Sequence, residues 1–398
     1  MTEQVPYQPR DVFGGDGSVP RALIAPARYV QGPGVLERLG RYLSLLPGSR
    51  AGLLLSPGGA ARFGDRIGAA LRAEGISASE VEFGGECSIE EIERIAAALG
   101  GAAPTVDYLV AVGGGKCIDA GRAAARRLGL PVAVCPSLAS TDAPCAALSV
   151  IYSSRGVKQG VEFFPDSPAL VAVDSEVVAQ APPRYLVAGM GDAMATWYEA
   201  RTCVRNPDAR SLLGGRPTIA AAALGELCAH TLFANGVAAA EAVRRGEVTE
   251  PLERVIEANT LLSGIGFESG GIAAAHSVVH GLTAIDAVRE NHMHGEMVAI
   301  GLLTQLVLEG TPREARRVAA FCAAVGLPVH LGQISLSPDD GATLATVMEA
   351  AMTLPFVANE PFEVSAASLA RAAADAHALG VEITRQRGDE AYRSLREA

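Results

Sequence analysis

The sequence contains no run of apolar residues long enough to cross a membrane. A membrane-spanning helix needs roughly 18 or more predominantly apolar residues. The N-terminal segment also lacks the basic region and apolar core of a secretory signal. These two absences predict a cytoplasmic protein.

Basic residues and paired cysteines are also scarce. Lys and Arg number 33 against 44 Asp and Glu, which gives a net charge of -11 at pH 7. Nucleic acids and anionic membranes would repel such a chain, so a small molecule is the expected partner. The seven cysteines include no C-x-x-C pair, which predicts reduced, buried thiols rather than a disulfide framework or a metal site.

What the sequence does contain is a large apolar fraction, 49%, arranged in two patterns. A length prior of roughly 100 to 200 residues per domain predicts about two domains. Residues 1–20 are rich in Pro and Gly and predict a loose extension. Over residues 21–180, short apolar runs such as AGLLLS and YLVAV alternate with helical stretches, which predicts βαβ units and a parallel sheet. Residues 181–398 show mainly helical periodicity, so an all-α domain is expected, with a ligand site between the two domains.

A glycine loop lies between a predicted strand and a predicted helix. Gly113, Gly114 and Gly115 would let the backbone approach a ligand, and the helix that starts near Lys116 offers unpaired N–H groups to a diphosphate. The loop fits neither the G-x-G-x-x-G fingerprint nor the P-loop pattern. It indicates a nucleotide-phosphate site, and the alternative of a tight turn that binds nothing stays open.

Hydroxyl and carboxyl groups follow the next predicted strand. Ser137, Ser140, Thr141 and Asp142 lie just beyond its C-terminal end, where open α/β sheets bind ligands. A Ser/Thr-rich loop by itself is often an ordinary turn. Its place beside the glycine loop favours a shared nucleotide and substrate site.

Four of the seven histidines, His276, His280, His292 and His294, fall close together. His276 and His280 would share one helical face. On an unbroken helix His276 and His294 would lie about 27 Å apart, so one metal ion can bind both only if the chain turns back. Gly281 can relax the first helix, and the polar segment RENHMHG can form a loop. The alternative is four unrelated histidines.

Asp192 is a candidate third ligand because it lies among small and apolar residues. Carboxylates are seldom buried without a partner or a metal. An exposed position or a helix cap is the alternative. One Asp with two His leaves a coordination position open, which is typical of catalytic rather than structural zinc, and the mixed oxygen and nitrogen set also suits Fe²⁺.

Several long motifs resemble the glycerol dehydrogenase family of the metal-dependent, iron-type alcohol dehydrogenase superfamily. They are PARYVQG, VGGGKxxD, ASTDAPxxALSVIY, APPRYLxxGxxDAxATWxEAR, EANTLLSGxGFESGGxAAAHxxxHG and HGExVA, in that family's order and from about residue 21 onward. The resemblance implies a Rossmann-like nucleotide-binding α/β domain, an α-helical domain of the dehydroquinate synthase-like fold, a catalytic zinc and NAD. It also implies a homo-oligomer, with the octamer as one form.

The resemblance assigns roles to individual residues. The Asp142 carboxylate would contact the substrate, Phe267 would form a wall of its pocket, and His280 would support the metal ligands or serve the proton path. The metal ligands fall on Asp192, His276 and His294. The cofactor contacts fall on Gly114, Gly115, Lys116, Ser137, Ser140, Leu148 and Tyr152.

Three positions depart from the family pattern. Ser56 stands where the family usually carries an Asp that binds the adenosine ribose, so the carboxylate that would repel a 2′-phosphate is missing and NADP is an alternative to NAD. Ala146 replaces a small hydroxyl residue and Cys117 replaces a Thr, and both changes can weaken or reshape cofactor binding.

The residues and the resemblance together predict reversible oxidation of glycerol to dihydroxyacetone, or of a related small 1,2-diol, with hydride transfer to NAD. A dehydrogenase or reductase acting on another alcohol, aldehyde or polyol is the first alternative. A lyase like the sugar-phosphate cyclases is a second, but it needs a basic phosphate pocket and the motifs offer chiefly Lys116. A metal-binding relative without activity is the third.

Overall fold

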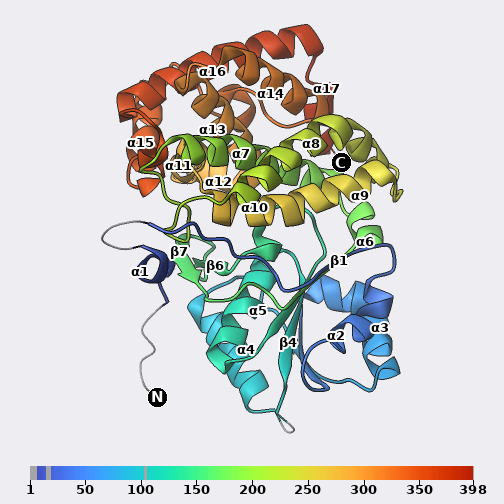
Figure 1. Cartoon of the computed structure of the whole chain (residues 1–398). Helices are drawn as coiled ribbons and strands as arrows, with labels where there is room; N and C mark the ends of the chain where they lie inside the picture. Colours follow the sequence, from blue (N-terminus) through green and yellow to red (C-terminus); the bar gives the residue numbers. More distant parts are fainter. Residues whose placement is uncertain (1–6, 15–18, 103–104, 398) are drawn as a thin grey trace.

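The computed structural model describes residues 7–14, 19–102 and 105–397. Figure 1 shows a parallel sheet flanked by helices in the lower part of the molecule and a layer of helices above it. This division confirms the predicted fold class. In the described part of the chain, no helix is long and apolar enough to cross a membrane.

In the described residues, a six-stranded parallel sheet has the order β1-β8-β5-β4-β2-β3. Strands β4, β5 and β8 are buried throughout, as expected of a parallel sheet with helices on both faces. Successive side chains alternate between the faces, so that Leu109 packs in one apolar core and Tyr108 and Val110 in the other. The strands are β1 (Tyr29–Gly32), β2 (Arg50–Leu55), β3 (Ser77–Glu82), β4 (Tyr108–Gly113), β5 (Val132–Pro136) and β8 (Leu170–Asp174).

The helices of the sheet region begin and end at residues suited to caps. Ser56 Oγ accepts a hydrogen bond from the Gly59 N–H at 3.2 Å and so caps α3. Gly129 ends α5 with a left-handed backbone, φ 67°, which favours glycine. The helices are η1 (Leu36–Arg38), α2 (Leu39–Leu43), α3 (Pro57–Ala73), α4 (Ile89–Gly100), α5 (Gly115–Leu128) and α6 (Ser175–Ala179).

An antiparallel hairpin, β6 (Leu148–Tyr152) and β7 (Lys158–Phe163), lies outside the main sheet and was not predicted. It packs against α5, where Arg122 donates a hydrogen bond to the Leu148 carbonyl and Ser149 Oγ donates one to the Asp119 carbonyl at 2.9 Å. The hairpin is connected to β5 through the loop at Asp142, which contains the short 3₁₀ helix η2 (Ala143–Cys145).

The helical part is centred on α7 (Pro183–Arg205), most of whose residues are buried and which contacts α8, α10 and α13. The last strand ends at Asp174, which agrees with the predicted change of pattern, while the division at residue 180 stays a prediction. The other elements are α8 (Ile219–Arg244), α9 (Glu250–Glu257), the π-helical turn η3 (Ala258–Leu262), α10 (Ser263–Gly270), α11 (Ala274–Leu282), α12 (Asp286–Asn291), α13 (His294–Leu308), α14 (Pro312–Val325), η4 (Leu331–Ile334), α15 (Gly341–Ala351), η5 (Pro355–Asn359), α16 (Ala366–Arg387) and α17 (Glu390–Glu397).

The predicted loose extension, residues 1–20, is described only in part, because residues 1–6 and 15–18 lie outside the described residues. The described part includes a short helix, α1 (Pro9–Phe13). A Cβ at Gly214 would touch Arg10, so this helix packs against the helical part of the chain.

All seven cysteines are free and buried, as predicted. Burial raises the pKa of the Cys117 thiol to about 12, so it is protonated and unreactive at neutral pH. Packing in the protein core therefore explains where the cysteines lie.

Candidate active site

Asp192 lies in the middle of α7 and is 1% exposed. Two glycines before it let other backbone segments touch this helix. A Cβ at Gly189 would overlap the carbonyl oxygen of Ala139, and one at Gly191 would overlap that of Gly295. Because every other residue carries a Cβ, the loop at Ala139 and the start of α13 can come this close to α7 only at glycine.

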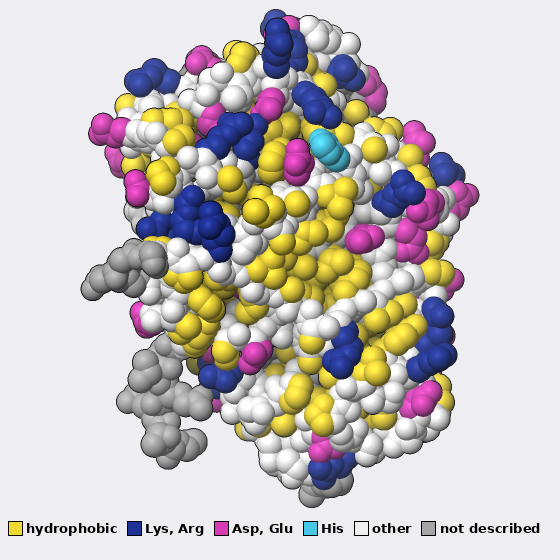
Figure 2. All heavy atoms as spheres, viewed as in Figure 1, with side chains coloured by type: hydrophobic (Ala, Val, Ile, Leu, Met, Phe, Trp, Pro, Cys, Tyr) yellow, Lys and Arg dark blue, Asp and Glu magenta, His cyan; other side chains and the backbone are white. Residues whose placement is uncertain are grey.

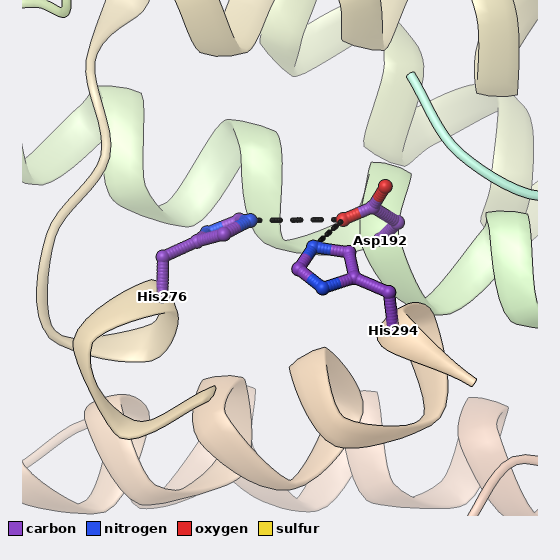
Figure 3. A group of neighbouring side chains, drawn as sticks. All are labelled: Asp192, His276 and His294. Carbon is purple, nitrogen blue, oxygen red and sulfur yellow. Dashed lines mark ion pairs between the residues drawn. The ribbon is translucent and has the colours of Figure 1, made fainter. Parts of the chain in front are cut away.

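Two histidines from different helices meet Asp192, as Figure 3 shows. The Oδ1 atom of Asp192 lies 3.6 Å from Nε2 of His276 and 3.4 Å from Nε2 of His294. Ligand atoms around a tetrahedral zinc, with bonds of about 2.0 to 2.1 Å, lie roughly 3.3 Å apart. The three side chains are therefore spaced so that they could hold one ion, and their role as metal ligands stays a prediction.

The segment that brings His294 back to Asp192 differs in secondary structure from the predicted loop. α11 carries His276, the short α12 follows, and α13 begins at His294. The predicted RENHMHG loop is wrong for residues 289–291, which complete α12, and for residues 294–295, which begin α13. His292 and Met293 alone connect α12 to α13, so the turn depends on two residues in extended conformation.

Gly281 does not relax α11, contrary to the prediction. The helix continues to Leu282, and a Cβ at Gly281 would overlap the carbonyl oxygen of Val347 in α15. The glycine therefore permits close helix packing and does not end the helix.

The Oδ1 atom of Asp192 has no hydrogen-bond partner among the residues that the structure describes. A buried carboxylate oxygen without a partner is costly, and a cation between it and the two imidazoles would satisfy it. Two imidazole nitrogens and one carboxylate oxygen are donors that both Zn²⁺ and Fe²⁺ accept. The residues present fit the metal that the sequence predicts.

The charges around these residues also favour a cation. Burial by itself lowers the pKa of His276, but Glu199 and Asp192 outweigh it and raise this pKa well above its usual value. Burial by itself raises the pKa of Asp192, but the imidazoles of His294 and His276 lower it below its usual range. The space between the three side chains therefore attracts a proton or a metal cation.

Asp142 reaches this cluster from the loop after β5 and is 8% exposed. Its backbone N–H donates to Oδ2 of Asp192 at 3.4 Å, and its own Oδ2 accepts a hydrogen bond from Ser263 Oγ at 3.1 Å. Ser263 Oγ in turn lies 2.8 Å from Thr196 Oγ1. Burial and the nearby Asp192 carboxylate raise the pKa of Asp142 well above its usual value. The site is thus built from both parts of the chain.

Two further side chains of the helical part hold the Asp142 loop. Asn259 Nδ2 donates to the Ala139 carbonyl at 2.9 Å, and both oxygens of Glu268 accept from the Ala147 N–H at 3.1 Å. Asn259 lies in the π-helical turn η3, a rare geometry that often occurs at functional sites. The loop is therefore anchored at both ends.

The predicted cofactor residues meet at the carboxyl edge of the sheet. The Ser56 N–H donates to the Val112 carbonyl at 3.4 Å, and the Ser137 N–H donates to the Gly113 carbonyl at 2.9 Å. Strand β2 lies between β3 and β4 in the sheet. The chain runs from β2 to β3 on one side of β2 and then crosses over to β4 on the other side. This is a topological switch point, where open α/β sheets bind ligands. Gly114 caps α5 and Gly115 begins it, so free N–H groups point from this edge.

Four other predicted contacts form two neighbouring pairs. Lys116 Nζ lies 5.0 Å from the Tyr152 ring centroid and bonds Oε2 of Glu86 at 2.6 Å. Leu148 and Phe267 belong to one apolar cluster. Ser140 is half-buried, two residues before Asp142. The cofactor and substrate roles of these residues stay predictions.

Two histidines are not brought into the cluster. His280 lies one turn beyond His276 on α11, and burial lowers its pKa. His292 faces Glu296, with Nδ1 3.5 Å from Oε2. The four neighbouring histidines in the sequence therefore occupy different environments.

The sequence analysis missed Glu199, whose carboxylate lies 2.5 Å from Nδ1 of His276. The signal was present, since Glu199 follows Asp192 by two helical turns in a segment free of other acidic residues. It also missed Ser263 and Asn259, which look like ordinary polar helix residues in the sequence.

The chain resembles known proteins over most of its length. A family model described as iron-containing alcohol dehydrogenase matches residues 26–175. Glycerol dehydrogenase of Escherichia coli O6:H1 is 46% identical over 83% of this chain and 89% of its own length. Glycolaldehyde reductase of Halobacterium salinarum is 40% identical over 90% of this chain and 98% of its own. The crystal structure of glycerol dehydrogenase from Schizosaccharomyces pombe has a TM-score of 0.86 and 32% identity, covering 92% of this chain and 93% of that one.

Proposed function

The chain belongs to the iron-containing alcohol dehydrogenase family, and we propose that it reversibly oxidises glycerol to dihydroxyacetone, or a closely related 1,2-diol, with NAD as hydride acceptor. It is an alcohol dehydrogenase that uses a metal and a nicotinamide cofactor on a small-molecule alcohol. The single observation that carries the proposal is the cluster of Asp192, His276 and His294 beside Asp142.

The chain's own residues hold and orient the reactants. When bound, the metal supplies Lewis-acid polarisation of the reacting oxygen and the nicotinamide takes up the hydride. Asp142 accepts a hydrogen bond from a neighbouring substrate hydroxyl, and Ser263 holds the Asp142 carboxylate in place. Phe267 forms an apolar wall. His280 supports the α11 ligand or serves the proton path.

The cofactor diphosphate would lie at the start of α5, over Gly114, Gly115 and Lys116. NAD is the proposed cofactor and NADP the alternative, because Ser56 offers a hydroxyl where a ribose-binding carboxylate would exclude the 2′-phosphate. The Ser56 hydroxyl also caps α3, so its contact with a ribose would compete with this bond. Zinc is the proposed metal and Fe²⁺ the alternative.

A second candidate is reduction of a small aldehyde. The observation that favours it is the 40% identity to the Halobacterium glycolaldehyde reductase, whose name describes an aldehyde reduction. The cyclase-like lyase is disfavoured, because Lys116, the chief basic residue of the motifs, is paired with Glu86.

A homo-oligomer in the cytoplasm, with the octamer as one form, also belongs to the proposal. Apolar side chains gather in the middle of the face that Figure 2 shows, with charged side chains around them. Helix α8 exposes large apolar residues of the kind that subunit interfaces bury, namely Ile219, Leu227 and Val237. Light scattering on the purified protein tests this, and a monomer would contradict it.

A steady-state screen tests the function. Glycerol, 1,2-propanediol, dihydroxyacetone and glycolaldehyde are compared with NAD(H) and NADP(H), on zinc-loaded and on Fe²⁺-loaded protein. We expect the highest kcat/KM for glycerol with NAD on zinc-loaded protein, and loss of activity with a chelator. Activity that a chelator leaves intact would contradict the metal-dependent reaction, and preference for glycolaldehyde would favour the second candidate.

A further inference from the structure

Glu199 is a fully buried carboxylate on α7, seven residues after Asp192. Seven residues are close to two helical turns, so both carboxylates project from one side of a single rigid helix. The imidazole of His276 lies between them, with Nδ1 2.5 Å from Glu199 Oε2 and Nε2 3.6 Å from Asp192 Oδ1. One helix therefore contacts both nitrogens of this ring.

Glu199 also holds the backbone beneath the ring. Its Oε1 accepts hydrogen bonds from the Ala273 N–H at 2.7 Å and from the His276 N–H at 3.1 Å. Among the described residues, its one ion-pair partner is His276. The whole carboxylate is thus committed to His276 and to the start of the helix that carries it.

The hydrogen bond to Nδ1 decides which nitrogen a metal meets. An ionised carboxylate only accepts hydrogen bonds, so Nδ1 must carry the proton in the neutral ring and Nε2 keeps its lone pair. We propose that Glu199 is a positioning residue that fixes the tautomer and orientation of His276 and thereby sets the metal affinity of the site. The proposal rests on the proposed metal-dependent function.

His294 has no comparable support. It is 44% exposed against 14% for His276, and among the described residues its one ion-pair partner is Asp192 itself. The site therefore combines a histidine whose orientation is set in advance with one that is freer to adjust. Loss of the Glu199 contact should weaken metal binding through His276.

The chain provides a matched control in Glu360. Its Oε1 accepts from the Ala274 N–H at 3.3 Å, at the same helix start, and Gln305 Oε1 accepts from the Ala275 N–H at 2.8 Å. Neither side chain has a hydrogen bond to the His276 ring in the described residues. The start of α11 thus has anchors apart from Glu199, and the effect on the ring can be separated from the effect on the helix.

The test compares wild-type protein with Glu199→Gln, Glu199→Asp and Glu360→Gln. The amide of Gln can donate to Nδ1 and so favour the wrong tautomer, whereas Asp keeps an acceptor. Zinc dissociation constants come from competition with a chromogenic chelator. The tautomer of His276 comes from ¹⁵N NMR of the metal-free proteins at a pH above the raised pKa of the ring, where the imidazole is neutral. Thermal unfolding of the metal-free proteins reports their folding.

We expect Glu199→Gln to bind zinc about 10- to 100-fold more weakly than wild type. We also expect the neutral His276 ring of this variant to carry its proton on Nε2. The zinc affinity of Glu360→Gln should lie within about threefold of wild type. The zinc affinity of Glu199→Asp should lie between those of wild type and Glu199→Gln. If Glu199→Gln and wild type bound zinc equally well, or if the tautomer of His276 were unchanged, this inference would be overturned and the proposed function would remain. Wild-type protein that binds neither zinc nor Fe²⁺ would overturn the proposed function and this inference with it.

Discussion

The two parts of the site present different chemistry. The sheet edge offers backbone N–H groups and hydroxyls on loops that follow strands, at Gly114, Ser137 and Ser56. The helical part offers ionisable side chains from buried helices, Asp192 and His276, each already facing an opposite partner. The arrangement at the sheet edge suits recognition of a large ligand, and the arrangement in the helical part suits binding of a metal cation.

This difference implies different responses to substitution. Changes in the helical part should remove metal and turnover together, since each side chain there faces a charged neighbour in a buried setting. Changes at the sheet edge should alter cofactor affinity or choice while the metal remains bound. The predictions below test that separation, in order of decreasing effect.

Asp192→Asn should produce the largest loss. It removes the charge that faces both imidazoles, and a Lewis-acid metal contributes several kcal/mol to the transition state, so we expect kcat/KM to fall by about 10³-fold or more. Metal content measured by mass spectrometry should fall with it.

His292→Gln is the control for that variant. His292 lies two residues before His294 but outside the metal cluster. It should keep its metal and a kcat/KM within about threefold of wild type, since the His292 side chain faces Glu296 and not the three proposed ligands. An equal loss in both variants would mean that the cluster has no special role.

Ser263→Ala should have an intermediate effect that links the two parts. The serine donates to the Asp142 carboxylate, and hydrogen bonds to charged groups contribute about 1.5 to 3 kcal/mol, so we expect kcat/KM for glycerol to fall by about 10- to 100-fold. The control is Ser269→Ala, a buried serine on the same helix that bonds the backbone of Ile24. It should lower thermal stability and leave kcat/KM unchanged.

Ser56→Asp should change cofactor choice and leave the metal in place. Asp is also a good N-cap, so α3 should still form. A carboxylate facing a 2′-phosphate costs several kcal/mol, so the ratio of kcat/KM for NADP to that for NAD should fall at least about 10-fold. An unchanged ratio would place the adenosine ribose elsewhere.

Glu268 should make the smallest contribution to activity and a measurable one to stability. Burial raises its pKa from 4.5 to about 7, and the Ala147 N–H and Arg122 partly offset this rise. The charge of Glu268 in turn contributes to the raised pKa values of Cys145 and Tyr7. The folded state therefore binds the proton more tightly than the unfolded chain, and this stability is present below pH 4.5 and lost as pH rises through about 7.

The Glu268→Gln variant tests this, because Gln does not titrate. Chemical unfolding at several pH values should show that wild type loses stability relative to the variant between about pH 4.5 and 7, by on the order of 3 kcal/mol at most. Parallel pH profiles for the two proteins would contradict the raised pKa.

Sequence patterns predict well the helices and strands whose formation depends on residues close together in the sequence. The buried runs of β2, β4, β5 and β8 and the capped helices between them follow from periodicity, and so does the glycine loop before α5. The hairpin β6–β7 and the strand β1 were not predicted, because β1 and β7 contain no buried run and the position of the hairpin depends on contacts with distant elements.

The same limit applies to the site. Asp192 and the two histidines could be identified from residue type, spacing and resemblance. The spacing of Glu199 from Asp192 is visible in the sequence, but its contact with His276 could not be predicted, because that contact depends on α11 packing beside α7. Gly281 and Gly191 look like helix-weakening residues in the sequence, but they are places where two backbones touch.

The most direct test of the central claim is a crystal of zinc-loaded protein measured at the zinc absorption edge. The account predicts one anomalous peak per chain within about 2.0 to 2.2 Å of Asp192 Oδ1 and of Nε2 in both His276 and His294. An active, zinc-containing enzyme with no peak between these three side chains would contradict it.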